Sequence, residues 1–306
     1  MTKYRPEGKL INTESNAYYL ANEERLREAA QKDVILEGRA IVCDCDHNLH
    51  IELGSMRGII PRSECAVGIE EGVTRDIAII SKVNKPVCFY VTDFTFVNGK
   101  KAVLLSRRAV QAEYSEKCKS LQKGDIVEAV VTHLENFGAF CDIGCGITSL
   151  LPIDSISVSR IPHPAARLAV GDDIRCIVKS FDEKDRITLS HKELLGTWSE
   201  NAQLFAVGET VSGVVRSIED YGIFVELMPN LAGLAEFVPN IDVGETVSVY
   251  IKSIIPEKIK IKLVIINSFK EDFPIKKIQY FYEGDHIDYF RYTPKNCDKL
   301  IETFFT

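Results

Sequence analysis

The chain has 306 residues, of which 45% are hydrophobic and 26% charged, an ordinary mix for a globular protein of two or three domains. Its formal net charge of −7 excludes a surface that is positive throughout, so any nucleic-acid site must be local. No apolar run approaches the roughly 20 residues that cross a bilayer, and Met1–Arg5 leads into polar sequence rather than a signal peptide. We therefore expect a cytoplasmic protein without membrane contact.

The N-terminal residues 1–33 are predicted to be a helical segment. Residues 1–13 show no pattern and are expected to be loosely ordered. From Thr13 or Ser15 as N-cap, apolar residues recur at helical spacing among charged ones, which predicts one amphipathic helix ending near Lys32. Such a helix packs on the neighbouring domain or, in the alternative, docks a partner.

Residues 34–108 read as short strands, with Asn98-Gly99 as a hairpin turn between the last two. The expected strands are 34–36, 40–42, 50–53, 87–91 and 102–105. Five strands in so short a segment indicate a small closed barrel. Residues 109–122 then read as a helical linker that stops near Gly124.

Two further barrels are predicted, at 123–195 and 207–268. The strands of the first of these are expected at 126–132, 139–143, 149–151, 174–181 and 186–190. Its third and fourth strands are joined by an irregular or short helical crossover over 157–170, whereas the last barrel is shortened there to 238–242. The linker 196–206 contains Trp198, which is expected to anchor it to a barrel.

The C-terminal extension, 269–306, is too aromatic to be disordered and is expected to fold against the last barrel. Its aromatic residues are Phe269, Phe273, Tyr280, Phe281, Tyr282, Tyr289, Phe290, Tyr292, Phe304 and Phe305.

An aromatic pair around a glycine occurs twice. The stretch 136–144 contains Phe137-Gly138-Ala139-Phe140, and Tyr221-Gly222-Ile223-Phe224 repeats the pattern one small domain later. Aromatic rings that flank a strand glycine can form a platform on which bases stack. A single such pair is more often a core or bulge feature, but its repetition in matching barrels favours a binding function.

The order of these motifs resembles the S1 RNA-binding domain, an OB-fold barrel named after the bacterial ribosomal protein in which it repeats. The motifs are Gly124-Asp125-Ile126-Val127, Phe137-Gly138-Ala139-Phe140, Gly171-Asp172-Asp173 and Arg186-Ile187-Thr188-Leu189-Ser190. The resemblance covers about residues 34–268 as three copies. It implies a mainly β fold of three tandem five-stranded OB barrels, with helical linkers and the C-terminal extension.

In the second copy, the resemblance implies an RNA-binding face with two aromatics, a third-strand position and a hairpin Asp-Arg pair. The family's histidine position is assigned here to Ser149, which can hydrogen-bond but cannot stack. The face therefore comprises Phe137, Phe140, Ser149, Asp182 and Arg186, with Lys179, Lys184 and His133 as possible additions nearby.

The other two copies depart from that pattern. In the third, Tyr221 and Phe224 form the platform, Arg216, Lys252 and Lys260 are candidate phosphate partners, Glu236 takes the histidine position and Pro256 the Asp position. The carboxylate puts RNA binding there in doubt. In the first copy, His47 and His50 replace the aromatics and Pro61 takes the third-strand position, which fits protein docking better than RNA reading.

Metal chemistry is the competing interpretation of the cysteines. Cys43-Asp44-Cys45-Asp46-His47 and His50 place soft ligands close together, and Cys141 and Cys145 are a weaker candidate pair. No second ligand pair at zinc-finger spacing occurs, and no Walker loop, dinucleotide fingerprint or catalytic triad order appears. We expect reduced thiols, no metal, no cofactor and no enzyme activity.

These observations predict a monomer that binds single-stranded RNA, mRNA in particular, and acts in translation at the small ribosomal subunit. The alternative is a scaffold that docks on a ribosomal or regulatory partner without strong RNA binding of its own. The acidic balance, Ser149, Glu236 and the degenerate first copy favour that alternative.

Overall fold

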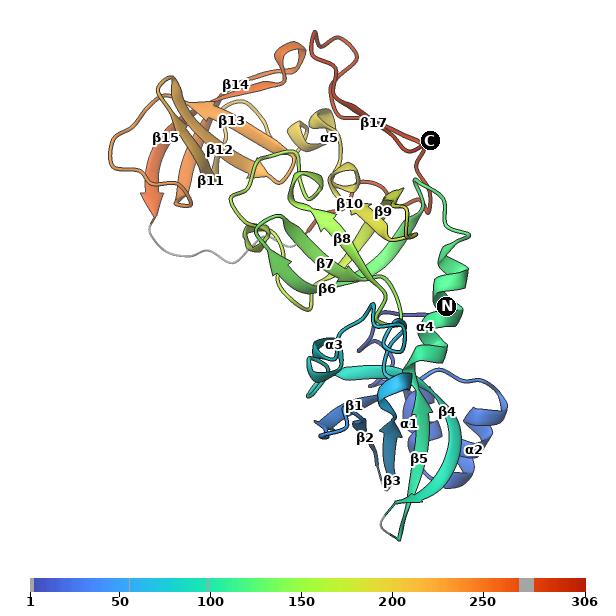
Figure 1. The fold of residues 1–306 in the computed structure, drawn as a ribbon. Helices are drawn as coiled ribbons and strands as arrows, with labels where there is room; N and C mark the ends of the chain where they lie inside the picture. Colours follow the sequence, from blue (N-terminus) through green and yellow to red (C-terminus); the bar gives the residue numbers. More distant parts are fainter. Residues whose placement is uncertain (1–2, 55, 98, 270–277) are drawn as a thin grey trace. The chain divides into compact units, whose positions relative to one another are not determined.

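The computed structural model describes residues 3–54, 56–97, 99–269 and 278–306. The chain forms two compact units. The first comprises Met1–Leu121, Glu128–Val130 and Asp142–Thr148, and the second Gln122–Val127, Val131–Cys141 and Ser149–Thr306. Three closed five-stranded barrels make up most of the described structure, which confirms the predicted fold class (Figure 1).

The first barrel has the strand order β1-β2-β3-β5-β4. Its strands are β1 (Leu36–Cys43), β2 (Leu49–Leu53), β3 (Met56–Ile60), β4 (Pro86–Val97) and β5 (Lys100–Ser106), with α3 (Ile77–Ile80) between β3 and β4. The predicted division of β1 into two strands was wrong, and β3 was missed. β1 continues through the fully buried Glu37 because its residues pair with β4 there, Glu37 with Cys88 and Gly38 with Val87. The predicted turn residue Asn98 lies outside the described residues.

Residues 3–13 are ordered, contrary to expectation. The buried Glu37 carboxylate accepts hydrogen bonds from the backbone N–H groups of Gly8, Leu10 and Ile11 at 3.0, 2.9 and 2.9 Å. Two helices follow instead of one, α1 (Glu14–Leu20) and α2 (Glu23–Gln31), because Asn22 is extended and its side chain caps the second. The buried residues of α2 join the core of the first barrel, which confirms the packing interpretation.

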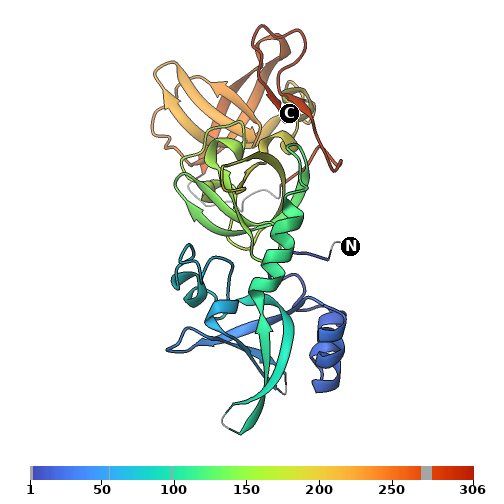
Figure 2. The same cartoon turned by 45° about the vertical axis from the view of Figure 1, so that its right-hand side comes forward.

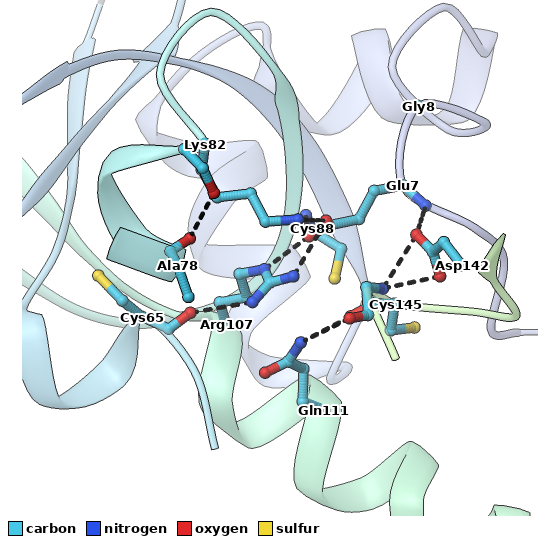
Figure 3. Close-up of polar contacts among 12 residues, drawn as sticks. Glu7, Gly8, Cys65, Ala78, Lys82, Cys88, Arg107, Gln111, Asp142 and Cys145 are labelled. Atoms are coloured by element: carbon cyan, nitrogen blue, oxygen red, sulfur yellow. Dashed lines mark hydrogen bonds and ion pairs between the residues drawn. The ribbon is translucent and has the colours of Figure 1, made fainter. Parts of the chain in front are cut away.

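A buried charge cluster fixes the same segment within the first unit (Figure 3). The Glu7 carboxylate pairs with Arg107 at 2.6 Å and Lys82 at 2.7 Å, and the Glu7 N–H donates to Asp142 at 2.8 Å. Burial alone would raise the pKa of Glu7, but the charges of Arg107 and Lys82 outweigh it and hold the pKa well below its usual range. The Glu7 carboxylate has cationic partners and the Asp142 carboxylate accepts from backbone N–H groups, so we interpret the cluster as structural.

Helix α4 (Arg107–Cys118) follows β5, where a linker helix was predicted. The Ser106 hydroxyl caps it by accepting from the Ala109 N–H at 2.9 Å. The second barrel then has the order β10-β8-β7-β6-β9, and in Figure 2 its strands curve around a common axis. Its strands are β6 (Ile126–Glu135), β7 (Gly138–Asp142), β8 (Thr148–Pro152), β9 (Asp173–Phe181) and β10 (Ile187–Ser190). The crossover is irregular with short 3-10 turns, as expected.

The third barrel has the order β11-β12-β13-β15-β14 and the short crossover that the sequence indicates. Its strands are β11 (Thr210–Glu219), β12 (Gly222–Met228), β13 (Leu231–Ala235), β14 (Thr246–Ile255) and β15 (Lys260–Phe269). Before it, α5 (Trp198–Ala202) begins with a capping box between Thr197 and Glu200. Trp198 is buried in the apolar cluster of this barrel, as predicted.

The described part of the extension folds, but its hydrogen bonds go mainly to the second barrel rather than to the third. It contains β16 (Tyr289–Arg291) and β17 (Glu302–Phe304); Phe273 lies outside the described residues. Arg175 of β9 donates to the carbonyls of Tyr282 and Gly284, both at 2.7 Å. The third barrel receives a bond from the Tyr292 hydroxyl to the Asn230 carbonyl at 2.6 Å.

Candidate nucleic-acid interface

The predicted platform of the second barrel lies where β6 turns into β7. Phe137 is in the turn and 55% exposed, and Phe140 is half-buried on β7. Their ring centroids are 5.9 Å apart with the planes at 87°. An exposed ring braced edge-to-face by a partly buried one offers an apolar face to a ligand without collapsing onto the barrel.

The third barrel repeats this geometry. Tyr221 is 70% exposed in the turn between β11 and β12, and Phe224 is half-buried on β12. The centroids are 6.1 Å apart with the planes at 89°. The two barrels that carry the aromatic-Gly-x-aromatic motif therefore hold the pair in the same geometry.

A glycine positions each pair and aligns the two barrels. A Cβ at Gly138 would lie 2.5 Å from the carbonyl oxygen of Leu151, and a Cβ at Gly222 would lie 2.4 Å from that of Ala235. Leu151 and Ala235 are therefore equivalent, and so are the residues that follow them, Pro152 and Glu236.

This equivalence corrects the assignment of Ser149. Its side chain is 2% exposed, inside the barrel, and its hydroxyl has no hydrogen-bond partner among the described residues. Pro152 occupies the third-strand position instead, as Pro61 does in the first barrel. The second barrel thus presents an apolar ring at this position, whereas the third presents the Glu236 carboxylate.

The last hairpin of the second barrel presents a cation beside the platform strands. Arg186 is 73% exposed at its side chain, and its Nε donates to Asp182 Oδ2 at 2.7 Å. The backbone N–H groups of Arg186 and Lys184 donate to Asp182 Oδ1, and these bonds lower the pKa of that carboxyl. Asp182 therefore shapes the turn and orients Arg186 toward solvent.

In the third barrel, Lys260 is the counterpart of Arg186. Lys260 pairs with Ile255 across the hairpin, as Arg186 pairs with Asp182. Ile255 therefore holds the Asp position that was assigned to Pro256. Pro256 instead begins the 3-10 turn Pro256–Lys258. Sequence reasoning also missed Lys262. This exposed residue pairs with Leu234, whose other neighbour is Phe224. The sequence could have indicated Lys262, because it lies two residues after Lys260 and so on the same strand face.

The remaining predicted cations differ in availability. Lys252 is exposed on β14, whereas Lys179 is half-buried and its Nζ donates to the Ser155 hydroxyl at 3.0 Å. Arg216 is not available for phosphate, because its side chain is largely buried and pairs with Glu226 at 2.9 Å. Its assignment as a phosphate partner was wrong.

Among its described residues, the first barrel has histidines at the positions of the aromatic pair. His50 pairs with Ile59 as Phe224 pairs with Leu234, which confirms the predicted alignment. The His50 Nε2 is bonded to Asp44 at 3.0 Å, and His47 lies 3.8 Å from Asp76. Burial alone would raise the pKa of Asp44. Hydrogen bonds from His50 and Asn48 outweigh this effect and lower the pKa of Asp44 to about 2.

Asp44, one of the proposed metal ligands in the same segment, has a structural role. Asp44 accepts from the N–H groups of Asp46 and Asn48 and so stabilises the turn between β1 and β2. Across the part of the chain that the structure describes, no group of three or more His, Cys, Asp or Glu could hold a metal ion. Nor does any helix in those residues have the length and apolar character to span a membrane.

Comparisons with known proteins bear on this geometry. Residues 120–192 match the family model of the S1 RNA binding domain. The chain is 34% identical over 193 residues to small ribosomal subunit protein bS1 of Leuconostoc lactis, covering 61% of this chain and 43% of the relative. It is 28% identical over 279 residues to the small ribosomal subunit protein bS1 homolog of Bacillus subtilis, covering 88% of this chain and 67% of the relative.

Among solved structures, the chain matches a multidomain protein with nucleic acid binding domains from Streptococcus pneumoniae. The match covers 76% of this chain and 73% of the other protein, at 13% identity and with a TM-score of 0.25. The sequence matches confirm the resemblance predicted from the motifs. Both named relatives are proteins of the small ribosomal subunit. Because the chain spans under half of the Leuconostoc relative, the role of that whole protein does not transfer by itself.

Proposed function

We propose, from the premise that residues 120–192 form an S1 RNA-binding domain, that this chain binds single-stranded RNA on the second and third barrels. The observation that carries the proposal is the repeated pair of aromatic rings, one exposed and one half-buried, at the same place in both. Stacking of a base on an aromatic face contributes about 1 to 3 kcal/mol, and OB barrels use it to hold single strands.

The second barrel is the stronger site. Arg186 is exposed on its last hairpin, with Lys184 and Lys179 in or next to the same hairpin. The third-strand position carries the apolar Pro152. In the third barrel, Lys260, Lys262 and Lys252 supply positive charge, but Glu236 places a carboxylate beside the platform, and carboxylates repel phosphate. The third barrel therefore extends the site rather than initiating binding.

The chain would act as a monomer in the cytoplasm and hold mRNA. The names of its relatives support a place at the small ribosomal subunit. The proposed domain boundaries are 34–108, 123–195 and 207–268, with the extension from 269. The similarity to ribosomal relatives over much of the chain supports this role.

The test is fluorescence anisotropy of a labelled U-rich single-stranded RNA. We expect Phe137→Ala/Phe140→Ala to weaken binding about fivefold or more, and Tyr221→Ala/Phe224→Ala to weaken it less. Phe96→Ala is the matched control, because Phe96 is 70% exposed on the first barrel, outside both platforms. Affinity should fall with salt at a slope of about −0.7 per phosphate contacted. No binding at micromolar concentration and low salt would refute the proposal.

A protein-docking scaffold is the second candidate function. It is favoured by Glu236 on the third barrel and by the first barrel, whose histidines are tied to Asp44 and Asp76. Co-sedimentation with ribosomes after nuclease treatment separates the two functions. Docking through protein would survive the treatment, whereas attachment through RNA would be lost.

A further inference from the structure

A third ring extends the platform of the second barrel. The imidazole of His133, on β6, lies nearly parallel to the Phe140 ring, with the planes at 22° and the centroids 6.4 Å apart. Its side chain is 62% exposed. In the third barrel, the residue paired with Phe224 on the corresponding strand is Ser217, which has no ring. The two platforms therefore differ in the surface they offer to a base.

A carboxylate is fixed at the edge of this third ring. The Nε2 of His133 lies 2.8 Å from Glu135 Oε1, and a carboxylate oxygen can only accept, so Nε2–H is the donor. Glu135 is 45% exposed at its side chain and stands on the same strand face, two residues after His133. A carboxylate repels phosphate, so we expect the Glu135 carboxylate to contact a base rather than the RNA backbone.

The Watson–Crick edges of the four bases differ in what they offer a group that can only accept. Guanine presents two adjacent donors, N1–H and the N2 amino group. Adenine and cytosine each present one donor beside an acceptor, and uracil presents one donor flanked by two acceptors. Proteins read unstacked bases in single-stranded RNA along these edges while an aromatic side chain holds the ring face.

We propose that the second barrel selects guanine, stacked on Phe140 and His133, through its paired donors to the Glu135 carboxylate. This inference rests on the proposed RNA-binding function and adds to it a base preference that stacking alone does not give. His133 both extends the stacking surface and holds Glu135 in place. Glu219 is the third-barrel residue that corresponds to Glu135, two positions after Ser217, and it lacks a neighbouring ring at that position.

The experiment measures anisotropy with four labelled oligouridines that carry one central guanine, adenine, cytosine or uracil. A good bidentate contact discriminates bases by at least about 1 kcal/mol, so we expect the guanine oligonucleotide to bind about fivefold or more tightly than the others. Glu135→Gln should abolish this difference, because its amide N–H would face a donor of guanine. His133→Ala should weaken binding of all four and reduce the preference.

Glu219→Gln is the matched control and should keep the preference intact. Both glutamates are exposed or half-exposed, so the variants are expected to fold, which circular dichroism checks. Equal affinity for the four oligonucleotides, or a guanine preference that persists in Glu135→Gln, overturns the inference while leaving RNA binding standing. If none of the four binds, the proposed function and this inference fall together.

Discussion

His191 is a buried neutral histidine in the second unit. Its Nδ1 lies 3.1 Å from the Ile156 carbonyl oxygen and its Nε2 lies 3.2 Å from the Tyr280 hydroxyl. The carbonyl can only accept, so Nδ1 carries the hydrogen and Nε2 accepts from Tyr280. Burial lowers the pKa of His191 to about 4, because the surroundings disfavour the imidazolium.

This histidine should make the second unit less stable in acid. The unfolded chain binds the proton near pH 6.5, whereas the folded chain binds it only near pH 4. The contribution of neutral His191 to the free energy of unfolding is therefore complete above pH 6.5 and is lost as the pH falls. Between pH 7.5 and 5 we expect the free energy of unfolding to drop by about 2 kcal/mol through His191. Urea unfolding followed by the fluorescence of Trp198, the one tryptophan in the sequence, measures it.

The comparison must be made with His191→Asn, which keeps a donor for Ile156 but does not titrate. His286 acts in the opposite direction: hydrogen bonds to Asp125 and Asp288 raise its pKa, so its contribution is lost as the pH rises. An identical pH dependence in His191→Asn would show that His191 does not cause the acid sensitivity.

At the scale of elements, the extension pairs with the start of β6. The Ile287 N–H donates to the Gly124 carbonyl and the Ile126 N–H to the Asp285 carbonyl, both at 2.9 Å. Gly124 has a φ of +93°, and a Cβ there would lie 2.3 Å from the Ile287 carbonyl oxygen. Only glycine allows both this backbone conformation and this approach.

Gly124→Ala should therefore displace the extension. Gly171→Ala is a matched control, because Gly171 has a φ of +98° but nothing within 4 Å of its Cβ position. We expect the control to lose about 1 kcal/mol, the cost of the left-handed conformation, and Gly124→Ala to lose at least about 1 kcal/mol more. Urea unfolding followed by Trp198 fluorescence measures both. Equal losses would mean that contact with the extension at Gly124 contributes nothing.

Elements were predictable where the signals were local. The strands 174–181 and 126–132 follow from alternation, glycine and a hairpin turn, all within a few residues of each other. Thr148–Pro152 has no clear alternation of apolar and polar residues, so its register was hard to predict. The sequence-based assignment placed the histidine position at Ser149, three residues before Pro152. Because three is an odd number, the assigned side chain lay on the opposite face of the strand. The order of residues 3–13 escaped prediction because it depends on Glu37 and Arg107, which are distant in sequence.

At the scale of the whole second unit, a buried ion triad joins its two barrels. Glu226 of β12 pairs with Arg216 of β11 and with Arg167 from the crossover of the second barrel, and all three side chains are largely buried. Asn230 adds bonds to the Lys192 and Gly196 carbonyls at 2.7 and 2.9 Å. Arg216 could be seen in the sequence as a cation, but the triad could not, because Glu226 also pairs with Arg167, which belongs to another barrel.

Glu226→Gln should weaken this junction strongly. It leaves two buried guanidinium groups without their counter-charge, which costs about 3 to 5 kcal/mol. Trp198 lies in the apolar cluster of the junction and reports its unfolding in urea. The triple variant Arg167→Met/Glu226→Leu/Arg216→Met, which removes all three charges, should recover most of the loss. If Glu226→Gln is as stable as the wild type, the triad does not hold the two barrels together.

The docked extension also sets an order of events in folding. His286 and Asp125 stand 161 positions apart, whereas the strands of each hairpin lie within a few residues of one another. Closing the longer loop costs more chain entropy, so the barrels should form before the extension reaches β6. The Ile126 amide, bonded to Asp285, would then gain protection from solvent exchange later than the rest of its own strand, whose start pairs with β9 through Gly124 and Val178.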